Sequence, residues 1–368
     1  MREPLDRLAD VALSVLPSMF DERTGLFSHK TLAIDGGYTN GRANADYSAA
    51  ALAGILSQRR AEPDRVVPVP RALDALHAVA AVAGSDAMLG NLLWASALAD
   101  DERAGEVLIA AQALDARAVV TAALGQLLHG VVAAGDRFPR LADRAEAVAA
   151  PMAAELLDRF VPDSELFRAG RLRLDQPRVA VGLRYTSFAH QVYPLHGLAA
   201  WYRRHGRAPD PLLRRVADRL VGAQGPLGQW WWLYAIGARR VIEGYPVYSV
   251  HQDGMAFMAL APLKALGIGD YDGPLARGLD WLDGANELHR PLTGDAPPFI
   301  CRCIQRTGSH ADLPFGISKR NLRAVQLRSL RTPARDVTEA DAGELEILEE
   351  CRSYHLGWLL YAHALMTT

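Results

Sequence analysis

Segments with the periodicity of α-helices follow one another along almost the whole chain. Ala, Leu and Arg, which favour helices, are abundant, whereas runs of β-branched or aromatic residues are scarce. The pattern predicts helices at about 3–16, 44–59, 70–83, 86–99, 103–114, 117–134, 138–159, 185–204, 210–223, 251–266, 273–286, 339–348 and 352–366. About a dozen helices joined mostly by short turns fit an all-α toroid of the (α/α)6 type, in which paired helices close into a ring around a central cup.

Four longer connections interrupt this series, at about 24–43, 161–183, 226–250 and 288–311. Long loops within a compact domain are usually functional, and in a toroid we expect them to gather around one mouth of the cup. An α-solenoid would contain a similar number of helices, but the N-terminal half shows no fixed period of self-similarity. Neither a low-complexity linker nor a shift in composition divides the chain, so residues 1–368 are expected to form a single toroid domain.

The composition argues against several classes of protein. Half of the residues are hydrophobic and 22% are charged, which is sufficient for a buried core. The formal net charge is -2 and no basic run is present, so nucleic acid is not expected as a partner. The N-terminal segment lacks an apolar stretch long enough for a signal peptide or a membrane span, and three cysteines do not suggest a disulfide framework. We therefore expect a cytoplasmic protein; the sequence does not indicate its oligomeric state.

Three consecutive tryptophans, Trp230, Trp231 and Trp232, follow the predicted helix at 210–223. Gly225 and Pro226 end that helix, because proline lacks a backbone N–H and glycine tolerates unusual dihedral angles. Adjacent side chains cannot all face one core on either a helix or a strand. At least one indole is therefore expected to border a cavity, a partner or solvent, which places a site nearby and makes the three tryptophans candidates for substrate binding.

The spacing Gln224-x-x-x-Gly228-x-Trp230 resembles the QW repeat of terpenoid cyclases such as squalene–hopene cyclase, which share an α/α toroid with protein prenyltransferases. A degenerate copy occupies 277–288, and 354–361 (YHLGWLLY) resembles the Tyr-His helix of prenyltransferase toroids. The resemblance implies an isoprenoid cyclase, which protonates its substrate with a buried acid and stabilises carbocations on aromatic faces. The Asp-x-Asp-Asp acid motif of that family is absent, and the nearest run is at 270–272.

Residues 243–255 (EGYPVYSVHQDGM) form the densest polar cluster, directly before an apolar helix. Its candidate site residues are Glu243, Tyr245, Tyr248, His251 and Asp253. One interpretation is structural: Ser249 caps the helix and Asp253 complements the helix dipole. The other is that His251 and Asp253 point into the cup as an acid–base pair, with the carboxyl pKa raised by the neighbouring tryptophans.

A second cluster opens the last predicted helix, where Glu350, Cys351, Tyr354 and His355 follow one another closely. Cys351 and His355 share a helix face, and together with Cys303 they would suit Zn²⁺. Prenyltransferase toroids bind zinc through an Asp, a Cys and the His of the Tyr-His helix; the resemblance carries His355 over to this role, with Cys303 as a candidate for the cysteine, but no equivalent Asp is present. The alternative is that both cysteines are buried without a ligand and that the histidine is hydrogen-bonded in the core.

Glu287 and Arg302 add charge to the connecting segments. A carboxylate at a helix C-terminus is disfavoured by the dipole. This position predicts that Glu287 either pairs with a cation such as Arg302 or takes part in binding the substrate; a solvent-exposed carboxylate is the simpler alternative.

These observations leave three functions open. An isoprenoid cyclase is favoured by the resemblance. A carbohydrate-active toroid enzyme (a glycoside hydrolase, lyase or epimerase) is the alternative, because tryptophans stack on sugars and carboxylate pairs such as Glu243/Asp253 or Asp253/Glu350 could serve as acid and base. A non-catalytic helical scaffold is the third. The expected partner in the first two is a small molecule, either an isoprenoid or a saccharide.

Overall fold

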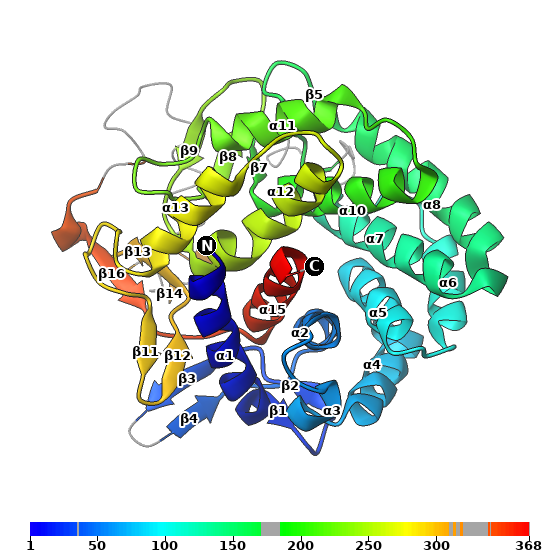
Figure 1. Ribbon diagram of the computed structural model, residues 1–368, viewed down its shortest axis with the longest axis horizontal. Helices are drawn as coiled ribbons and strands as arrows, with labels where there is room; N and C mark the ends of the chain where they lie inside the picture. Colours follow the sequence, from blue (N-terminus) through cyan, green and yellow to red (C-terminus); the bar gives the residue numbers. More distant parts are fainter. Residues whose placement is uncertain are drawn as a thin grey trace.

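A closed ring of helices forms the centre of the computed structural model, which describes residues 1–34, 37–170, 185–308, 312–313, 317–318, 338 and 340–367. Within these residues the inner ring consists of α2 (Ala45–Ser57), α5 (Asp86–Leu98), α7 (Thr121–Arg137), α10 (Ala189–His205), α12 (Ala256–Ala265) and α15 (Ser353–Thr367). Each contacts the next, and α15 contacts α2, so the ring is complete (Figure 1).

A second layer of helices surrounds this ring. Its members are α1 (Arg2–Met19), α4 (Val69–Ala83), α6 (Ala104–Gln112), α8 (Ala142–Asp158), α11 (Pro211–Val221) and α13 (Asp272–Leu282), with the short α3 (Pro63–Val66) between α2 and α4. Inner and outer helices alternate along the chain. The N-terminal helix α1 packs against the C-terminal helix α15, so the two ends of the chain complete the double ring predicted from the sequence (Figure 1).

Glycines allow the inner helices to approach closely. A Cβ atom at Gly54 in α2 would overlap the backbone carbonyl of Gly357 in α15, and one at Gly130 in α7 would overlap that of Gly90 in α5. Gly125 in α7 meets the backbone of α10 in the same way. Because interiors are close-packed, any side chain at these positions would push the helices apart and open the ring.

Most predicted helices are confirmed, and their starts follow ordinary capping rules. The side chains of Asn44, Ser85 and Asp210 accept hydrogen bonds from backbone N–H groups in the first turns of α2, α5 and α11. The helix predicted at 339–348 is wrong: a 3₁₀ turn at Ala342–Glu344 is followed by a strand at Leu345–Leu348. The helix predicted from 251 begins as a π-helical turn at His251–Met255.

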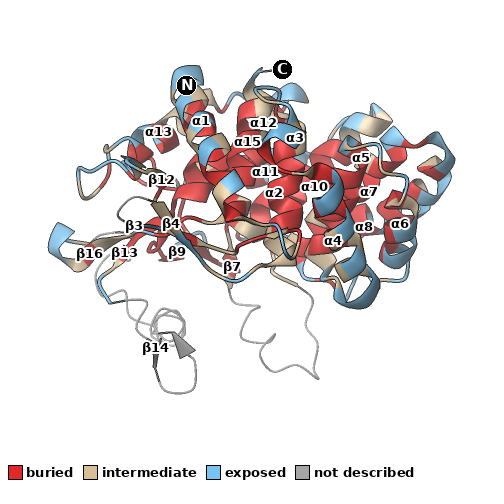
Figure 2. Ribbon diagram, turned by 90° about the horizontal axis from the view of Figure 1, so that it is seen from below, coloured by how far each residue is buried: buried red, intermediate tan, exposed pale blue. Residues whose placement is uncertain are grey.

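The four long predicted connections each lead from an outer helix into an inner one, so they meet at the N-terminal ends of the inner helices. These connections and the residues that flank them carry short antiparallel strands that the sequence pattern did not reveal. These are β1 (Phe20–Asp21), β2 (Leu26–Phe27), β3 (Thr31–Ile34), β4 (Gly37–Asn40), β5 (Phe160–Val161), β6 (Leu166–Phe167), β7 (Tyr185–Ser187), β8 (Leu233–Ala235), β9 (Val241–Glu243), β10 (Val247–Tyr248), β11 (Thr293–Asp295), β12 (Pro298–Ile300), β13 (Cys303–Arg306), β14 (Asp312–Leu313), β15 (Ile317–Ser318) and β16 (Leu345–Leu348). Strands β3, β4, β7, β9 and β13 lie along one side of the ring (Figure 2), which we call the loop mouth.

Two three-stranded sheets position the loops of this mouth. One has the order β7-β8-β9 and the other β10-β13-β16. The second aligns Tyr248 with Cys303 and Cys303 with Leu348, so three segments far apart in sequence meet beside the start of α12. Across the described ranges, no helix combines the length and the apolar character required to cross a membrane.

Candidate functional site

Helical periodicity identifies the side chains that face the inside of the ring. A cavity of about 530 Å³ lies at the C-terminal ends of the inner helices, and its wall includes Ser57, Leu98, Ala133 and Tyr361. Residues two or three whole turns closer to the loop mouth share the same helix faces. These residues are Asp46, Asn91, Gln126 and Tyr354, from α2, α5, α7 and α15. The inner wall near the loop mouth therefore combines a carboxylate, two amides and a phenol.

Tyr354 lies at the centre of an aromatic cluster in this mouth. Its ring is 4.6 Å from that of Tyr47, and it interacts electrostatically with Tyr193, Tyr248 and Arg302. Burial raises the pKa of the Tyr354 hydroxyl far above its usual value, and the proximity of Tyr47 adds to this effect. The phenol is therefore neutral and available as a hydrogen-bond donor. Tyr354 and Arg302, which the sequence analysis named in two separate segments, thus lie together beside the candidate residue Tyr248.

Glu350 is surrounded by cations at the edge of this cluster. It accepts hydrogen bonds from Arg302 and Arg352 and lies 3.4 Å from the Nζ atom of Lys30. Burial alone would raise the pKa of Glu350, but the two guanidinium groups outweigh burial and lower it to about 2. Glu350 is therefore an ionised anchor for Arg302, which lies over the Tyr248 ring at 5.4 Å. Three cations face one carboxylate here, so the group carries excess positive charge.

The sequence analysis did not identify two carboxylates that lie at the loop mouth. Asp46 lies in the first turn of α2 and accepts a hydrogen bond from the Ser85 hydroxyl. Asp86 opens the neighbouring inner helix α5; it is half-buried, and burial raises its pKa. Each follows an N-capping residue, a position where an acidic side chain ordinarily complements the helix dipole. The alternation of inner and outer helices is the signal that would have distinguished them from first-turn acids on the outer layer.

Asp253 pairs with His355, not with His251 as the sequence predicted. The Nε2 atom of His355 lies 2.9 and 2.8 Å from the two carboxylate oxygens of Asp253. Asp253 is completely buried and His355 is 2% exposed. Burial raises the pKa of Asp253, and the contact with His355 opposes this effect without cancelling it. The pair joins the π-helical turn that precedes α12 to the first turn of α15, and it is almost completely closed to solvent.

His251 is enclosed by aromatic rings. Its centroid is 4.7 Å from that of Phe188 and 5.1 Å from that of Tyr248, and its Nδ1 atom is 3.2 Å from the carbonyl oxygen of Trp230. Burial lowers the pKa of His251 to about 3, so the ring is neutral near pH 7. It does not form the predicted acid–base pair with Asp253, because the Asp253 carboxylate is occupied by His355.

The three tryptophans separate into a buried pair and a half-buried third ring. Trp230 and Trp231 are completely enclosed, with Trp230 stacked on Phe188 at 5.7 Å. Trp232 is half-buried, and its ring meets that of Tyr248 edge to face at 6.5 Å. Trp232 is therefore the indole that borders the mouth, and the other two belong to the core.

The residues of the QW-like motif connect the 222–232 loop to α13. The Gln224 amide donates to the carbonyl oxygens of Gly228 and Pro274, each at 2.9 Å, and accepts from Arg277 at 2.6 Å. Gly228 has φ +96, and a Cβ atom there would overlap the Arg277 carbonyl. The motif thus explains a local packing arrangement of the fold and supplies no reactive group.

Glu287 forms a separate, fully hydrogen-bonded cluster. It accepts from the Tyr245 hydroxyl at 2.7 Å, from the Trp281 indole at 2.8 Å and from the Gln229 amide at 3.0 Å. The expected pairing of Glu287 with Arg302 is wrong, because Arg302 is bonded to Glu350.

Tyr245 also contacts two side chains outside this cluster. The Trp231 ring meets the Tyr245 ring edge to face at 6.2 Å, and the Arg306 guanidinium lies over the Tyr245 ring at 5.1 Å. Glu243 is buried nearby, 3.7 Å from Arg306, and accepts a hydrogen bond from the Tyr245 backbone. The carboxylates of Glu243, Asp253 and Glu350 therefore each have different partners: Arg306, His355 and the pair Arg302 and Arg352.

The predicted zinc ligands do not form a metal site. Cys303 and Cys351 are buried, and burial raises the pKa of the Cys351 thiol, which opposes the thiolate that zinc requires. His355 is bonded to Asp253. In the part of the chain that the structure describes, no group of three or more His, Cys, Asp or Glu side chains is arranged to hold a metal ion.

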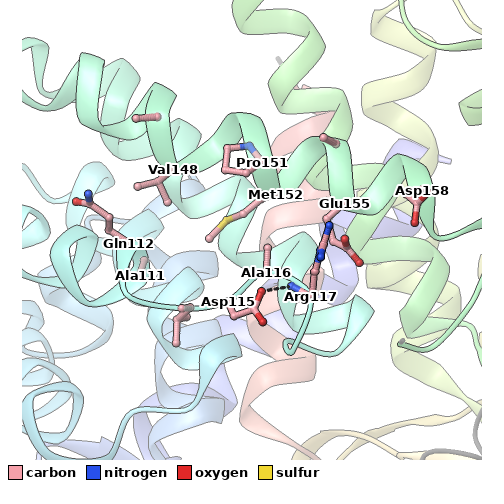
Figure 3. A pocket seen from close by; sticks show the side chains of 13 residues that line it. Ala111, Gln112, Asp115, Ala116, Arg117, Val148, Pro151, Met152, Glu155 and Asp158 are labelled. Atoms are coloured by element: carbon pink, nitrogen blue, oxygen red, sulfur yellow. Dashed lines mark hydrogen bonds between the residues drawn. The ribbon is translucent and has the colours of Figure 1, made fainter. Parts of the chain in front are cut away.

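A second cavity, of about 580 Å³, lies away from the axis of the ring, between α8 and the segment that leads from α6 to α7 (Figure 3). Met152, Pro151 and Val148 form one side, and Asp115 and Arg117 belong to the other (Figure 3). Its lining contains none of the residues of the loop mouth.

No family model matches the chain, and no curated protein matches its sequence. Its fold is similar to that of an unsaturated glucuronyl hydrolase specific for heparin, with 14% identity, a TM-score of 0.59, and coverage of 100% of this chain and 97% of that one. A polysaccharide lyase is similar at 13% identity and a TM-score of 0.54, with 98% and 97% covered. A type II terpene cyclase from Scytonema is similar at 11% identity and a TM-score of 0.51, with 99% and 96% covered.

These comparisons confirm the α/α toroid and correct the expected chemistry. The similar solved structures are mostly carbohydrate-active enzymes by name, including further unsaturated glucuronyl hydrolases and a family 88 glycosyl hydrolase. The terpene cyclase stands beside them as one of several enzyme classes on the same fold. The prediction of a terpenoid cyclase as the main function is therefore wrong, and the carbohydrate alternative is better supported.

Proposed function

We propose that the protein is a glycan-acting enzyme of the hydrolase or lyase class, with its active site at the loop mouth. The observation that carries this proposal is the placement of Asp46 and Asp86 at the starts of two neighbouring inner helices, with Asp46 directly before Tyr47, whose ring contacts Tyr354. Glycoside hydrolysis requires two carboxyl groups, one to protonate the leaving oxygen and one to activate water or attack the sugar. The names of the structurally similar enzymes point to the same class of substrate.

The two carboxyl groups differ in their surroundings, which favours different roles. Burial raises the pKa of Asp86, as a general acid requires. Asp46 accepts a hydrogen bond from the Ser85 hydroxyl, which fixes the orientation of its carboxylate and suits a base or nucleophile. In this scheme Asp86 gives its proton to the glycosidic oxygen while Asp46 receives one from water.

Aromatic and basic side chains of the mouth supply the binding surface. Tyr47, Tyr354 and the half-buried Trp232 offer faces on which a sugar ring can stack, and Asn91 and Gln126 offer amides for its hydroxyl groups. The surplus positive charge of Arg302, Arg352 and Lys30 around Glu350 favours a sugar that carries a carboxylate or sulfate. We therefore expect acidic glycans to be better substrates than neutral ones.

The test is turnover of a panel of oligosaccharides by the purified chain. Heparin-derived and other uronate-containing oligosaccharides would be compared with neutral mannan and xylan fragments, with farnesyl diphosphate as an isoprenoid. Release of reducing ends without a new conjugated double bond indicates hydrolysis, and a new double bond indicates a lyase. Conversion of the isoprenoid with none of the sugars cleaved would contradict the proposal.

Substitution of the two carboxylates tests the assignment of roles. Asp86→Asn and Asp46→Asn should each lower kcat by about 10²-fold or more while KM changes little, because proton transfer by a positioned group contributes about this factor. Asp143→Asn is the matched control: Asp143 also lies in the first turn of a helix, but in the outer layer. Unchanged kcat in both mouth variants would remove these residues from the mechanism.

A further inference from the structure

The ring has a second opening at the C-terminal ends of the inner helices, opposite the loop mouth. The cavity of about 530 Å³ found there is within the size range of small-molecule sites. Its lining includes Trp94, His129 and Tyr361, with Arg59, Arg137 and Arg203. A smaller space of about 70 Å³ adjoins it and shares His129, Arg203 and Tyr361.

Stacked aromatic side chains separate this cavity from the loop mouth. The Trp358 indole donates to the Tyr193 hydroxyl at 3.0 Å, and the Trp94 ring stacks on Trp358 at 5.9 Å. The His196 Nε2 atom lies 2.9 Å from the Tyr361 hydroxyl. These groups cross the inside of the ring, so a ligand in the second cavity would contact none of the proposed catalytic carboxylates.

Two of the three arginines have no acidic partner. Arg137 is paired with Asp100, and Asp136, which also lines the cavity, is paired with Arg204. Arg59 and Arg203 form no ion pair with any residue that the structure describes. The walls therefore present two guanidinium groups whose charge the protein does not neutralise.

Arg203 lies in the last turn of α10, where a basic residue ordinarily complements the helix dipole. That role does not require the side chain to turn inward. The charge of Arg203 nevertheless acts on His129, His196 and Tyr361, which belong to three different inner helices. Arg203 therefore faces the cavity.

His129 supplies the second observation. Its side chain is 8% exposed and borders both the large and the small space. The ring stacks on His196 at a centroid distance of 3.8 Å and meets Trp94 at 4.5 Å. Its nitrogens form no hydrogen bond within the described residues. These nitrogens are not sealed off by protein atoms, so a ligand in the cavity can form a hydrogen bond with the imidazole.

We propose that this second cavity binds a small organic anion, a carboxylate or phosphate attached to a flat apolar ring. Arg59 and Arg203 bind the anionic group, because guanidinium forms charge-assisted hydrogen bonds with carboxylate and phosphate oxygens. The ring of the ligand lies against Trp94 and Tyr361, and His129 hydrogen-bonds to its polar edge. The site is independent of the glycan-cleaving function proposed for the loop mouth.

Titration calorimetry on the intact chain tests this site with defined probes: phenyl phosphate, benzoate, inorganic phosphate and the neutral benzyl alcohol. Phenyl phosphate or benzoate should bind, and benzyl alcohol should bind at least about tenfold more weakly, since it lacks the charge. Comparison of the two anions distinguishes a phosphate from a carboxylate ligand. No heat from either anion at about 1 mM, or equal binding of benzyl alcohol, would overturn the proposal.

Variants locate the binding within the molecule. Arg203→Gln should weaken binding of the anion by about tenfold or more. Arg207 lies just beyond the same helix and outside the cavity, so Arg207→Gln should leave the affinity unchanged. Ala133→Phe keeps both arginines and fills the space from the α7 wall, so it should abolish binding. Circular dichroism verifies that each variant is folded. Wild-type affinity in folded Arg203→Gln or Ala133→Phe protein would place the anion elsewhere and refute the site.

Discussion

At the scale of single residues, the contact between Asp253 and His355 is the most consequential polar contact inside the ring. Both groups are enclosed, and both carboxylate oxygens lie within 3 Å of one ring nitrogen. Removing one partner of such a buried pair leaves the other polar group buried without a hydrogen-bond partner. The resulting loss of folding stability is far larger than the stability that the intact pair contributes. The contact joins α12 to α15 and so helps to hold the loop mouth in shape.

Asp253→Asn should therefore reduce stability more than it reduces catalysis. We expect a loss of about 2–4 kcal/mol in the free energy of unfolding, because the amide leaves His355 with a poorer partner. The kcat of the folded fraction should remain close to that of the wild type, because this carboxylate is enclosed by protein and bonded to His355. Urea unfolding measures the first effect and turnover at matched folded fraction the second.

Asp6→Asn is the control, because Asp6 makes the same kind of contact with His363 at 2.8 Å but lies partly in solvent. Its loss of stability should be clearly smaller than that of Asp253→Asn. A folded Asp253→Asn protein without turnover would instead make Asp253 part of the reaction, as the sequence first suggested.

Sequence spacing could identify Asp253 and His355 as polar groups at helix starts, but not as partners. They are separated by 102 residues, and only closure of the ring between α12 and α15 brings them together. Asp46 was missed for a related reason. In the sequence it is one of several acidic residues in first turns, and its position on an inner helix follows only from the order of the layers.

At the scale of elements, contacts between glycines determine how tightly the inner helices pack. Gly54→Ala would place a methyl group onto the Gly357 carbonyl, where the backbone of α15 would have to move. Over-packing of this kind costs about 1–3 kcal/mol. We therefore expect a lower midpoint in urea unfolding, although alanine favours helices more than glycine does.

Gly105→Ala separates packing from helix propensity. Gly105 lies in the outer helix α6, and its new methyl group would meet only a Leu141 methyl at 3.7 Å. This variant should be as stable as the wild type or more stable by up to about 1 kcal/mol. If Gly54→Ala were as stable as Gly105→Ala, the α2–α15 contact would not be what limits how closely the inner helices pack.

The helix wrongly predicted at 339–348 shows where local sequence fails. The segment contains Ala, Leu and Glu, which favour helices. In the structure Glu346 instead pairs with Gln305 across a ladder of β13 and β16, at 2.8 Å between side chains. Tertiary pairing with a distant strand overrides propensity there, whereas helices packed on both faces, such as α7 and α10, follow their periodicity closely.

At the scale of the whole molecule, buried histidines make the fold sensitive to acid. His196 and His251 are 3% and 5% exposed, and burial lowers the pKa of each to about 3. Burial also lowers the pKa of His190 to about 4 and that of His129 well below its usual value. In the unfolded chain these rings bind a proton below about pH 6.5. The unfolded state therefore binds more protons over this range, and stability falls as the pH falls.

The free energy of unfolding should decrease by about 1 kcal/mol per pH unit for each such histidine as the pH is lowered from about 6.5 to 5, because the unfolded ring is only half protonated at pH 6.5. Asp253, whose pKa is raised by burial, acts in the opposite direction but as a single group. Most unfolded carboxylates remain ionised above pH 5, so the histidines dominate this range. Urea unfolding at several pH values gives the slope directly.

His196→Gln removes one of these groups, and its amide can still reach the Tyr361 hydroxyl that His196 contacts. The slope between pH 6.5 and 5 should become shallower by about 1 kcal/mol per unit, whatever the effect on stability at pH 8. His289→Gln, at an exposed position, should leave the slope unchanged. An unaltered slope in His196→Gln would mean that the His196 imidazole binds a proton in the folded protein as it does in the unfolded chain. The stacked pair of His196 and His129 would then carry a positive charge inside the toroid.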